Sequence, residues 1–160
     1  MEKILLGAGC FWGVQYYFDQ VPGVVSTNVG YSGGSLKNPT YEDVCSHKTG
    51  HAEVLEVIYD SKIVSLETIL KQFFRMHDPT QLNRQGPDIG DNYRSTIFYY
   101  NDAQKNTADK IRDEAQQKYK EKIVTSIEKA KEFYLAEEYH QKYTERTGMG
   151  MCHISYEKVD

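Results

Sequence analysis

Long apolar runs are missing from this sequence of 160 residues. The first apolar stretch ends at Gly7, and no segment approaches the roughly 20 apolar residues that are needed to cross a bilayer. That first stretch is also too short for the apolar core of a signal peptide. We therefore expect a cytoplasmic protein that neither enters nor spans a membrane.

Cysteine is scarce. The three cysteines, Cys10, Cys45 and Cys152, are odd in number and lie far apart along the chain. Small secreted proteins that depend on disulfides carry a denser and even-numbered set. This pattern favours free or catalytic thiols over a structural disulfide framework.

Neither sign of charge is in large excess, with 19 basic and 23 acidic side chains and a net charge of −4. No basic face is concentrated enough to attract phosphate backbones, so we expect no nucleic-acid partner. Hydrophobic residues make up 39% of the chain, which is enough for a folded core. The length suits one domain over residues 1–160, without linker or repeat, and we expect a monomer.

The spacing of apolar residues predicts alternating strands and helices. Strands are expected over residues 3–8, 24–29, 51–59, 93–100 and 123–127, and helices over residues 11–18, 65–77, 102–119 and 135–144, with a short helical turn at 40–44. The order strand, helix, strand, strand, helix, strand is typical of the split βαβ arrangement of ferredoxin-like folds. We therefore predict an α+β two-layer sandwich with a mixed sheet, an appended C-terminal helix and an irregular tail.

Cys10 is the first candidate for chemistry. It lies between a glycine-rich strand end and the first turn of a predicted helix, where unpaired N–H groups and the helix dipole stabilise an anion. Such a cysteine has its pKa lowered from about 8.5, and the thiolate is the reactive form. From position alone, a small buried hydrophobic residue is an equally good interpretation.

Glu53 is the second candidate. In a strand with period two its side chain shares a face with Leu55, Val57 and Tyr59. Loss of solvation on that apolar face would raise the carboxyl pKa and make Glu53 a proton donor near neutral pH. The alternative is a glutamate at the edge of the sheet that reaches water.

Aromatic and polar residues supply the remaining candidates. Phe11 and Trp12 follow Cys10 directly and could form an apolar wall for a group such as a methyl, although core packing is the commoner use of such residues. The polar loop over residues 86–93 has more hydrogen-bonding groups than a connection needs. The chain also has 13 tyrosines, whose hydroxyls can donate hydrogen bonds in a site.

Several motifs together resemble one family. They are Gly9-Cys10-Phe11-Trp12-Gly13, Gly30-Tyr31-Ser32-Gly33-Gly34, the run from Asn38 to Cys45, Thr49-Gly50-His51-Ala52-Glu53, His77-Asp78-Pro79-Thr80, Arg84-Gln85-Gly86, the run from Asp88 to Ser95, Phe133-Tyr134, Ala136-Glu137 and Tyr139-His140-Gln141. In this order and spacing they resemble the S-type peptide methionine sulfoxide reductases, and the likeness runs almost from end to end. The combination is far more specific than the first pentapeptide alone.

The resemblance implies a role for each matching position. Cys10 would be the nucleophile, Phe11 and Trp12 the pocket for the S-methyl group, and Glu53 the acid. Tyr41 and Tyr93 match the family's donors to the sulfoxide oxygen, and Asp88 matches a polar position of the same pocket. A sulfoxide sulfur is a poor electrophile until its oxygen is protonated or strongly hydrogen-bonded, which explains why these residue types are needed.

The resemblance also implies the catalytic cycle. Oxygen transfer would leave methionine and a Cys10 sulfenic acid, which a second thiol condenses with to form a disulfide. Cys152 matches the family's first resolving cysteine, and residues 153–160 contain no further cysteine for a second relay. The Cys10–Cys152 disulfide would be recycled by thioredoxin, or glutaredoxin would act on Cys10 instead. We interpret Cys45 as structural, and expect no metal or bound cofactor.

Three other interpretations of the residues stay open. A zinc site could use cysteines and histidines, but only His47 and His51 have the spacing of a ligand pair. A thiol hydrolase or acyltransferase would use Cys10 with His51 or His77 as base. A peptide-binding module would use the aromatic residues and could dispense with Cys10. Gly7 and Gly9 make no dinucleotide-binding motif, so NADPH would act only through a partner reductase.

Overall fold

The computed structural model describes residues 1–149. Its central feature is a six-stranded sheet in the order β7-β6-β1-β3-β2-β8. The strands are β1 (Glu2–Ala8), β2 (Val24–Ser32), β3 (Ala52–Tyr59), β6 (Ser95–Tyr99), β7 (Ser126–Lys129) and β8 (Tyr134–Leu135). A separate two-stranded hairpin pairs β4 (Arg84–Gln85) with β5 (Asp88–Ile89).

Five α-helices and two short 3₁₀ helices are described beside the strands. They are α1 (Phe11–Phe18), α2 (Tyr41–Cys45), α3 (Leu66–Met76), η1 (Asp91–Tyr93), α4 (Asp102–Gln116), η2 (Glu138–His140) and α5 (Tyr143–Thr147). Side-chain oxygens of Ser65 and Asn101 cap the first turns of α3 and α4, and Thr40 and Asp43 form a reciprocal capping box at α2. The predicted starts of α3 and α4 are therefore confirmed. No helix in the described part of the chain is both long and apolar enough to cross a membrane.

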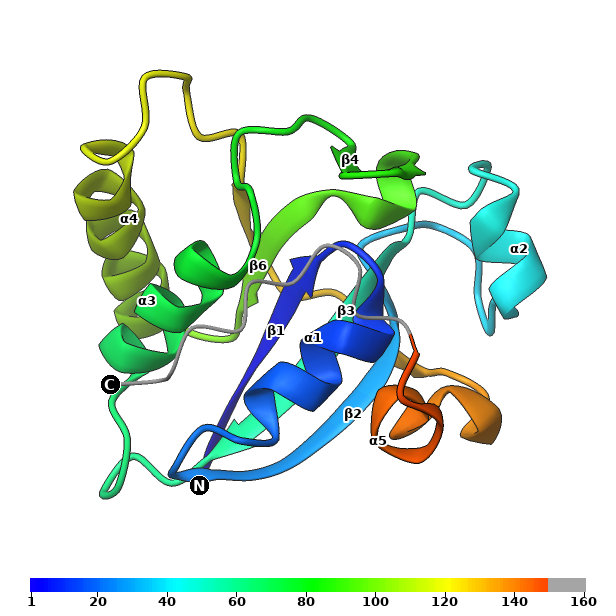
Figure 1. Ribbon diagram of the computed structural model, residues 1–160, viewed down its shortest axis with the longest axis horizontal. Helices are drawn as coiled ribbons and strands as arrows, with labels where there is room; N and C mark the ends of the chain where they lie inside the picture. Colours follow the sequence, from blue (N-terminus) through cyan, green and yellow to red (C-terminus); the bar gives the residue numbers. More distant parts are fainter. Residues whose placement is uncertain (150–160) are drawn as a thin grey trace.

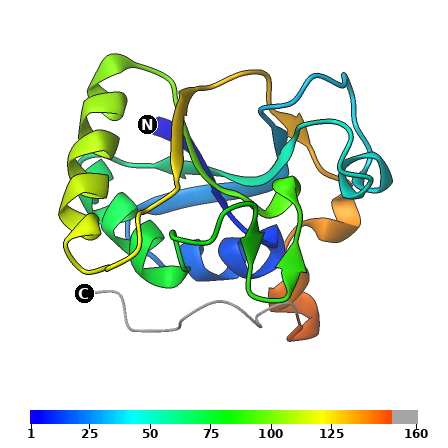
Figure 2. The ribbon, with the colours of Figure 1, turned by 90° about the horizontal axis from the view of Figure 1, so that it is seen from above.

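The four central strands confirm the predicted split βαβ core. Helix α1 connects β1 to β2, and α3 lies between β3 and β6 in the chain. These four strands lie side by side in the order β6, β1, β3, β2, and each neighbouring pair is antiparallel. The outer strand β7 pairs with β6 in parallel, so the sheet is mixed as predicted. The result is an α+β sandwich of a sheet and a helical layer, shown from two sides in Figures 1 and 2.

Alternation along the strands separates two cores. One face of the sheet carries Leu6, Leu55 and Val57, which pack with residues of α1, α3 and α4 in the main cluster. The opposite face carries a smaller cluster that includes Val54 and Phe98. Glu53 alternates with Val54 and shares the helix-covered side with Leu55 and Val57, because side chains along a strand point to opposite faces in turn.

The predicted helix over residues 135–144 is wrong. Leu135 instead belongs to β8, which pairs with Gly30 of β2, and a short 3₁₀ helix and α5 follow it. Lys142 adopts φ +58°, a left-handed conformation that interrupts any continuous right-handed helix. The predicted strand at 123–127 is also shifted, since β7 begins at Ser126, where its register with Thr96 of β6 begins.

One end of the sheet gathers elements from distant parts of the chain. Figure 1 shows α2 and the β4 hairpin toward the end of the sheet where β1 passes into α1. The ribbon of α5 lies beside α1, although more than 120 residues separate them in sequence. Cys10, Phe11 and Trp12 lie at this start of α1, Tyr41 lies in α2 and Asp88 lies in the β4–β5 hairpin.

Candidate active site

Cys10 is the N-cap residue of α1 and is partly exposed. The turn that delivers it from β1 requires Gly9, whose φ of +92° is strained for any residue with a Cβ. The thiol therefore stands at the helix end where backbone N–H groups and the dipole favour a negative charge. The predicted strand-to-helix junction is confirmed.

Glu53 is the buried acid of this region, with only 1% of its surface exposed. The Phe11 backbone N–H donates to its Oε1 atom at 3.3 Å, and the Asn92 side-chain amide donates to its Oε2 atom at 3.2 Å. Burial raises the pKa of Glu53 to about 8, against these two donors, which lower it, and with a smaller contribution from the charge of Asp88. At neutral pH the carboxyl is therefore mainly protonated, as the apolar strand face predicted.

The hydrogen bonds leave that proton available. Oε1 accepts from the Phe11 N–H, and Oε2 accepts from the Asn92 amide. Both groups are donors in these bonds, so neither of them accepts a hydrogen bond from the carboxyl O–H. The bond from Phe11 also fixes the carboxyl against the first residue of α1, directly beside Cys10 in sequence. The structure thus places a protonated acid next to the helix end that holds the thiol.

Tyr41 and Tyr93 lie in the same electrostatic environment. Burial raises the pKa of each phenol far above its usual range, and the charge of Glu53, which is ionised at the high pH where a phenol titrates, is the next cause for both. The charges of Cys45, Asp88 and Cys10 also raise the pKa of Tyr93, so these groups belong to its electrostatic environment. Both hydroxyls therefore keep their protons and can donate hydrogen bonds throughout the physiological range.

Tyr41 is held by its backbone N–H. Its backbone N–H donates to Oε2 of Glu137 at 3.1 Å, while the hydroxyl of Tyr31 donates to Oε1 of the same carboxylate at 3.0 Å. Although desolvation opposes the change, these hydrogen bonds and the carboxylate's own backbone lower the pKa of Glu137. The Cys45 thiol, one turn later on α2, contributes to the raised pKa of Tyr41, so Cys45 borders the site.

The loop before β6 supplies Asn92 and Tyr93. Gly90, at φ +145°, begins the 3₁₀ helix η1 that carries both. A Cβ at Gly90 would collide with the imidazole of His47 and come within 2.6 Å of Oδ1 of Asn92. Asp88 lies just before this turn in the β4–β5 hairpin. The predicted polar loop therefore brings the Asn92 amide onto Glu53 and places Tyr93 next to it in sequence.

Aromatic rings close the other side of the site. Phe11 is almost fully buried and its ring lies 5.7 Å from that of Tyr31. Trp12 is partly exposed and stacks on Tyr143 at 4.0 Å, and its indole N–H donates to Nδ1 of His140 at 2.8 Å. The two aromatic residues thus differ: Phe11 is core, whereas Trp12 keeps part of its surface in solvent.

Sequence reasoning gave no role to several residues that the structure places here: Asn92, Glu137, His140 and Tyr143. Asn92 lies within the predicted polar loop, and Glu137 and His140 lie within quoted motifs. The sequence therefore marked these segments, but it did not show which residues the three side chains contact. Cys152 lies outside the described residues. The other predicted site residues, Cys10, Phe11, Trp12, Tyr41, Glu53, Asp88 and Tyr93, share one region.

The structure gives no support to His51 or His77 as the base of a thiol hydrolase. His51 accepts from the Gly34 N–H through Nδ1 and contacts the Leu36 carbonyl through Nε2 at 2.6 Å. Both ring nitrogens of His77 are likewise engaged, with the Phe73 carbonyl and the Ser95 hydroxyl. Within residues 1–149, no three metal-ligating side chains are grouped closely enough to hold an ion.

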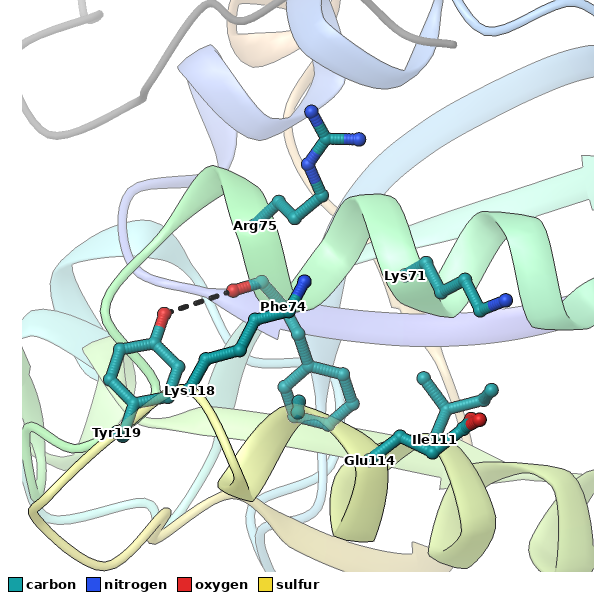
Figure 3. Close-up of a pocket in the computed structure, with 8 residues that line it drawn as sticks. Lys71, Phe74, Arg75, Ile111, Glu114, Lys118 and Tyr119 are labelled. Atoms are coloured by element: carbon teal, nitrogen blue, oxygen red, sulfur yellow. Dashed lines mark hydrogen bonds between the residues drawn. The ribbon is translucent and has the colours of Figure 1, made fainter.

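A groove lies elsewhere, between α3 and α4 (Figure 3). Its cavity volume is about 620 Å³, and the Tyr119 hydroxyl donates to the Phe74 carbonyl at one end. Lys71, Arg75 and Lys118 border it. None of the predicted site residues within the described part of the chain lines this groove.

Comparison with known proteins places this geometry in a family. The family model described as "Peptide methionine sulfoxide reductase" matches residues 2–160. The chain belongs to the peptide methionine sulfoxide reductase family. The matching activity is peptide-methionine (S)-S-oxide reduction, and the resemblance drawn from the sequence motifs is thus confirmed.

Curated relatives match along nearly the whole chain. The reductase MsrA of Methanothermobacter thermautotrophicus is 53% identical over 155 residues, which cover 96% of this chain and 92% of the relative. MsrA of Geobacter sulfurreducens is 53% identical over 154 residues, covering 95% of each chain. Both relatives carry the family's name, and both alignments cover nearly the whole of each chain. The family assignment therefore does not depend on a fragment.

Solved structures of the family share the fold. Reduced Mxr1 from Saccharomyces cerevisiae superposes with a TM-score of 0.87 at 41% identity, covering 93% of this chain and 87% of that one. Methionine sulfoxide reductase A of Corynebacterium diphtheriae gives 0.89 at 37% identity, covering 93% and 76%. Mxr1 in complex with Trx2 gives 0.64 at 35% identity, covering 89% and 84%.

Proposed function

We propose that the chain reduces methionine (S)-sulfoxide with Cys10 as nucleophile and Glu53 as acid. The observation that carries this assignment is the buried carboxyl of Glu53, which the Phe11 N–H fixes to the helix end that Cys10 caps and whose pKa burial raises. A perturbed acid beside an activated thiol matches the needs of sulfoxide reduction, in which oxygen must be protonated while sulfur is attacked.

Binding precedes the chemistry. The S-methyl group would lie against Phe11 and Trp12, and the sulfoxide oxygen would accept hydrogen bonds from the hydroxyls of Tyr41 and Tyr93. Both phenols keep their protons, because burial and the nearby carboxyl raise their pKa values. Asp88 would contribute to the polar side of the same pocket. These contacts polarise the S–O bond before any proton moves.

The redox step transfers one oxygen atom. The Cys10 thiolate attacks the sulfoxide sulfur as Glu53 gives its proton to the oxygen, and the S–O bond then breaks. The hydroxyl ends on Cys10 as a sulfenic acid, and the sulfur of the substrate leaves as a thioether with its lone pair restored. Sulfur of the substrate is thus reduced by two electrons and Cys10 is oxidised by two.

A second thiol closes the cycle. Condensation of the Cys10 sulfenic acid with the Cys152 thiol would release water and form a disulfide. The Mxr1–Trx2 complex supports thioredoxin as the reductant of that disulfide in this chain, and glutaredoxin acting on Cys10 is the second candidate. No resident metal or cofactor takes part in this scheme. We further propose that residues 1–160 act as one domain and as a monomer.

The decisive experiment combines both sulfoxide epimers with dithiothreitol and counts the methionine formed. We expect product from the S epimer alone, and none from Cys10→Ser. Cys45→Ser is the matched control, since it removes a thiol that borders the site without removing the nucleophile. A peptide-binding module would instead bind its ligand equally well after Cys10→Ser, and turnover by that variant would overturn the assignment of the nucleophile.

The resolving thiol needs a separate test. Cys152→Ser should form about one methionine per Cys10 in a single turnover and then recycle poorly with thioredoxin. Unchanged steady-state turnover with thioredoxin would remove Cys152 from the cycle. Because the first turnover needs only Cys10 and Glu53, this outcome would leave the reductase assignment intact.

A further inference from the structure

Glu137 joins two parts of the chain that are distant in sequence. Its Oε1 atom accepts a hydrogen bond from the Tyr31 hydroxyl at 3.0 Å, and its Oε2 atom accepts one from the Tyr41 backbone N–H at 3.1 Å. Tyr31 is fully buried in β2, and Tyr41 is the first residue of α2. One carboxylate therefore connects the central sheet to the short helix that carries a proposed oxygen donor.

The sheet fixes the backbone on both sides of Glu137. Strand β8 pairs with β2 directly before it, and the side-chain amide of Gln141, shortly after it, bonds both the N–H and the carbonyl of Val29 in β2. Tyr31, the partner of the carboxylate, lies opposite Glu53 in the register of β2 with β3. Glu137 and the proposed acid therefore have fixed places on one set of neighbouring strands.

Helix α2 depends on contacts outside itself. It has five residues, and helices this short are marginal on their own. Thr40 and Asp43 cap each other's backbone N–H groups, and the Tyr41 N–H is bonded by Glu137 instead. A ring contact with His140, 4.5 Å between centres, restricts the tilt of the Tyr41 phenol. The bond to Glu137 restricts the backbone from which that phenol projects.

The charge on Glu137 strengthens both hydrogen bonds. Desolvation opposes ionisation, but the bonds that the carboxylate accepts from its own backbone, from Tyr41 and from Tyr31 lower its pKa below the usual range. A charged acceptor makes a shorter and stronger hydrogen bond than a neutral one. An apolar side chain at this position would leave the buried Tyr31 hydroxyl and the Tyr41 N–H without these acceptors, which is unfavourable.

We propose that Glu137 is a positioning residue that holds the Tyr41 hydroxyl where it can donate to the sulfoxide oxygen while Glu53 protonates that oxygen. The inference rests on the proposed function, in which Tyr41 is one of two oxygen donors. The hydroxyl lies at the far end of a rigid ring, so a small rotation of α2 moves it farther than it moves the backbone. A displacement of about 1 Å is enough to remove much of the benefit of a catalytic contact.

The first test removes the charge and one of the two acceptor oxygens. In Glu137→Gln one of the two donors loses its acceptor, and the remaining oxygen is neutral and accepts more weakly. We expect kcat/KM for methionine (S)-sulfoxide with dithiothreitol to fall about three- to tenfold, and not below the value of Tyr41→Phe, because the effect passes through that hydroxyl.

The matched control is Glu138→Gln, which removes the same charge from the exposed neighbouring residue. This variant should keep kcat/KM within about twofold of wild type, since exposed substitutions usually have small effects. An equal fall in both Gln variants would show an effect of net charge and would overturn the proposal. So would a kcat/KM in Glu137→Gln equal to that of wild type.

A double-mutant cycle isolates the route of the effect. In a Tyr41→Phe background, Glu137→Gln should change kcat/KM no further, because the hydroxyl that it positions is already absent. An equal fall in both backgrounds would mean that Glu137 acts without that hydroxyl. Urea unfolding of the same variants separates stability from positioning: a loss of stability with unchanged kcat/KM in the folded protein would make Glu137 structural only.

Nuclear magnetic resonance provides a readout that does not depend on turnover. The Tyr41 amide proton donates to the Glu137 carboxylate, so its chemical shift should move in Glu137→Gln and stay near wild type in Glu138→Gln. An unchanged shift in Glu137→Gln would contradict the positioning role. If the wild type reduces no sulfoxide but the shift moves as expected, the proposed function fails while the anchoring of α2 by Glu137 stands.

Discussion

The end of the sheet around Cys10 and the groove between α3 and α4 differ in the solvent exposure of their ionisable side chains. At the first, Glu53 is buried and loses its charge near neutral pH. At the second, Lys71, Arg75 and Lys118 border an open cavity, and the nearby Lys110–Glu67 ion pair is solvent-exposed. A cavity alone therefore does not identify the reactive region, which the buried acid with a shifted pKa marks better.

Replacing the buried acid should have the largest effect on activity. Glu53→Gln should lower kcat/KM for methionine sulfoxide by about 10²–10⁴-fold at pH 7, because proton donation by a positioned acid contributes that much. The loss in wild type should set in as pH rises through about 8, where Glu53 gives up its proton. Parallel pH–rate profiles for the two proteins between pH 6 and 9 would exclude the acid role.

The same carboxyl should make stability depend on pH. Between its ordinary pKa of 4.5 and its folded value of about 8, the folded state holds a proton that the unfolded state has released. Raising the pH through this window therefore destabilises the fold, and at about 1.4 kcal/mol per pKa unit the total is on the order of a few kcal/mol.

Urea unfolding of wild type and Glu53→Gln at pH 5 and pH 8.5 measures this effect. The free energy of unfolding should fall in wild type, with a flatter response in the Gln variant. A wild-type protein that grows more stable over this interval would show that Glu53 is ionised in the fold.

The phenols should give a smaller effect than the acid. Tyr41→Phe and Tyr93→Phe each remove one hydrogen bond to the developing negative oxygen, and we expect about a tenfold fall in kcat/KM for each, with near-normal stability. Tyr16→Phe is the control, since this tyrosine lies farther along α1. If all three variants keep wild-type rates, the oxygen is polarised by other groups.

The groove should respond least of all. Lys71→Ala and Lys118→Ala remove solvent-accessible charges at the border of the cavity, and we expect rates with dithiothreitol within about twofold of wild type, since such substitutions usually change stability by less than about 0.5 kcal/mol. A large loss of dithiothreitol-driven turnover would mean that the groove, and not only the Cys10 end, takes part in the reaction.

The sequence predicted the elements whose signals are local. Period-two alternation placed Glu53 on an apolar face, and apolar spacing predicted the starts of α3 and α4, which the Ser65 and Asn101 side chains cap in the structure. The helix predicted over residues 135–144 was wrong. Leu135 pairs with Gly30 in the sheet and Lys142 is left-handed, and these two features outweighed the helical spacing. Pairing partners over 100 residues away leave no periodic trace in the segment itself.

The candidate site divides along the same line. Cys10, Phe11, Trp12, Tyr41, Glu53, Asp88 and Tyr93 could be named from the sequence, because motifs of a known family surround them. Only tertiary structure joined Glu53 to the Phe11 N–H and to Asn92, and Trp12 to His140.

Sequence by itself determined which functional groups this chain carries, the family that they resemble and the helix end at which the thiol stands. The folded structure decided that burial raises the pKa of Glu53 to about 8. It also decided that His140 is buried and accepts a hydrogen bond from Trp12 through Nδ1. The reason is physical: residue type fixes what a side chain can donate or accept, whereas desolvation and long-range contacts fix its charge and direction.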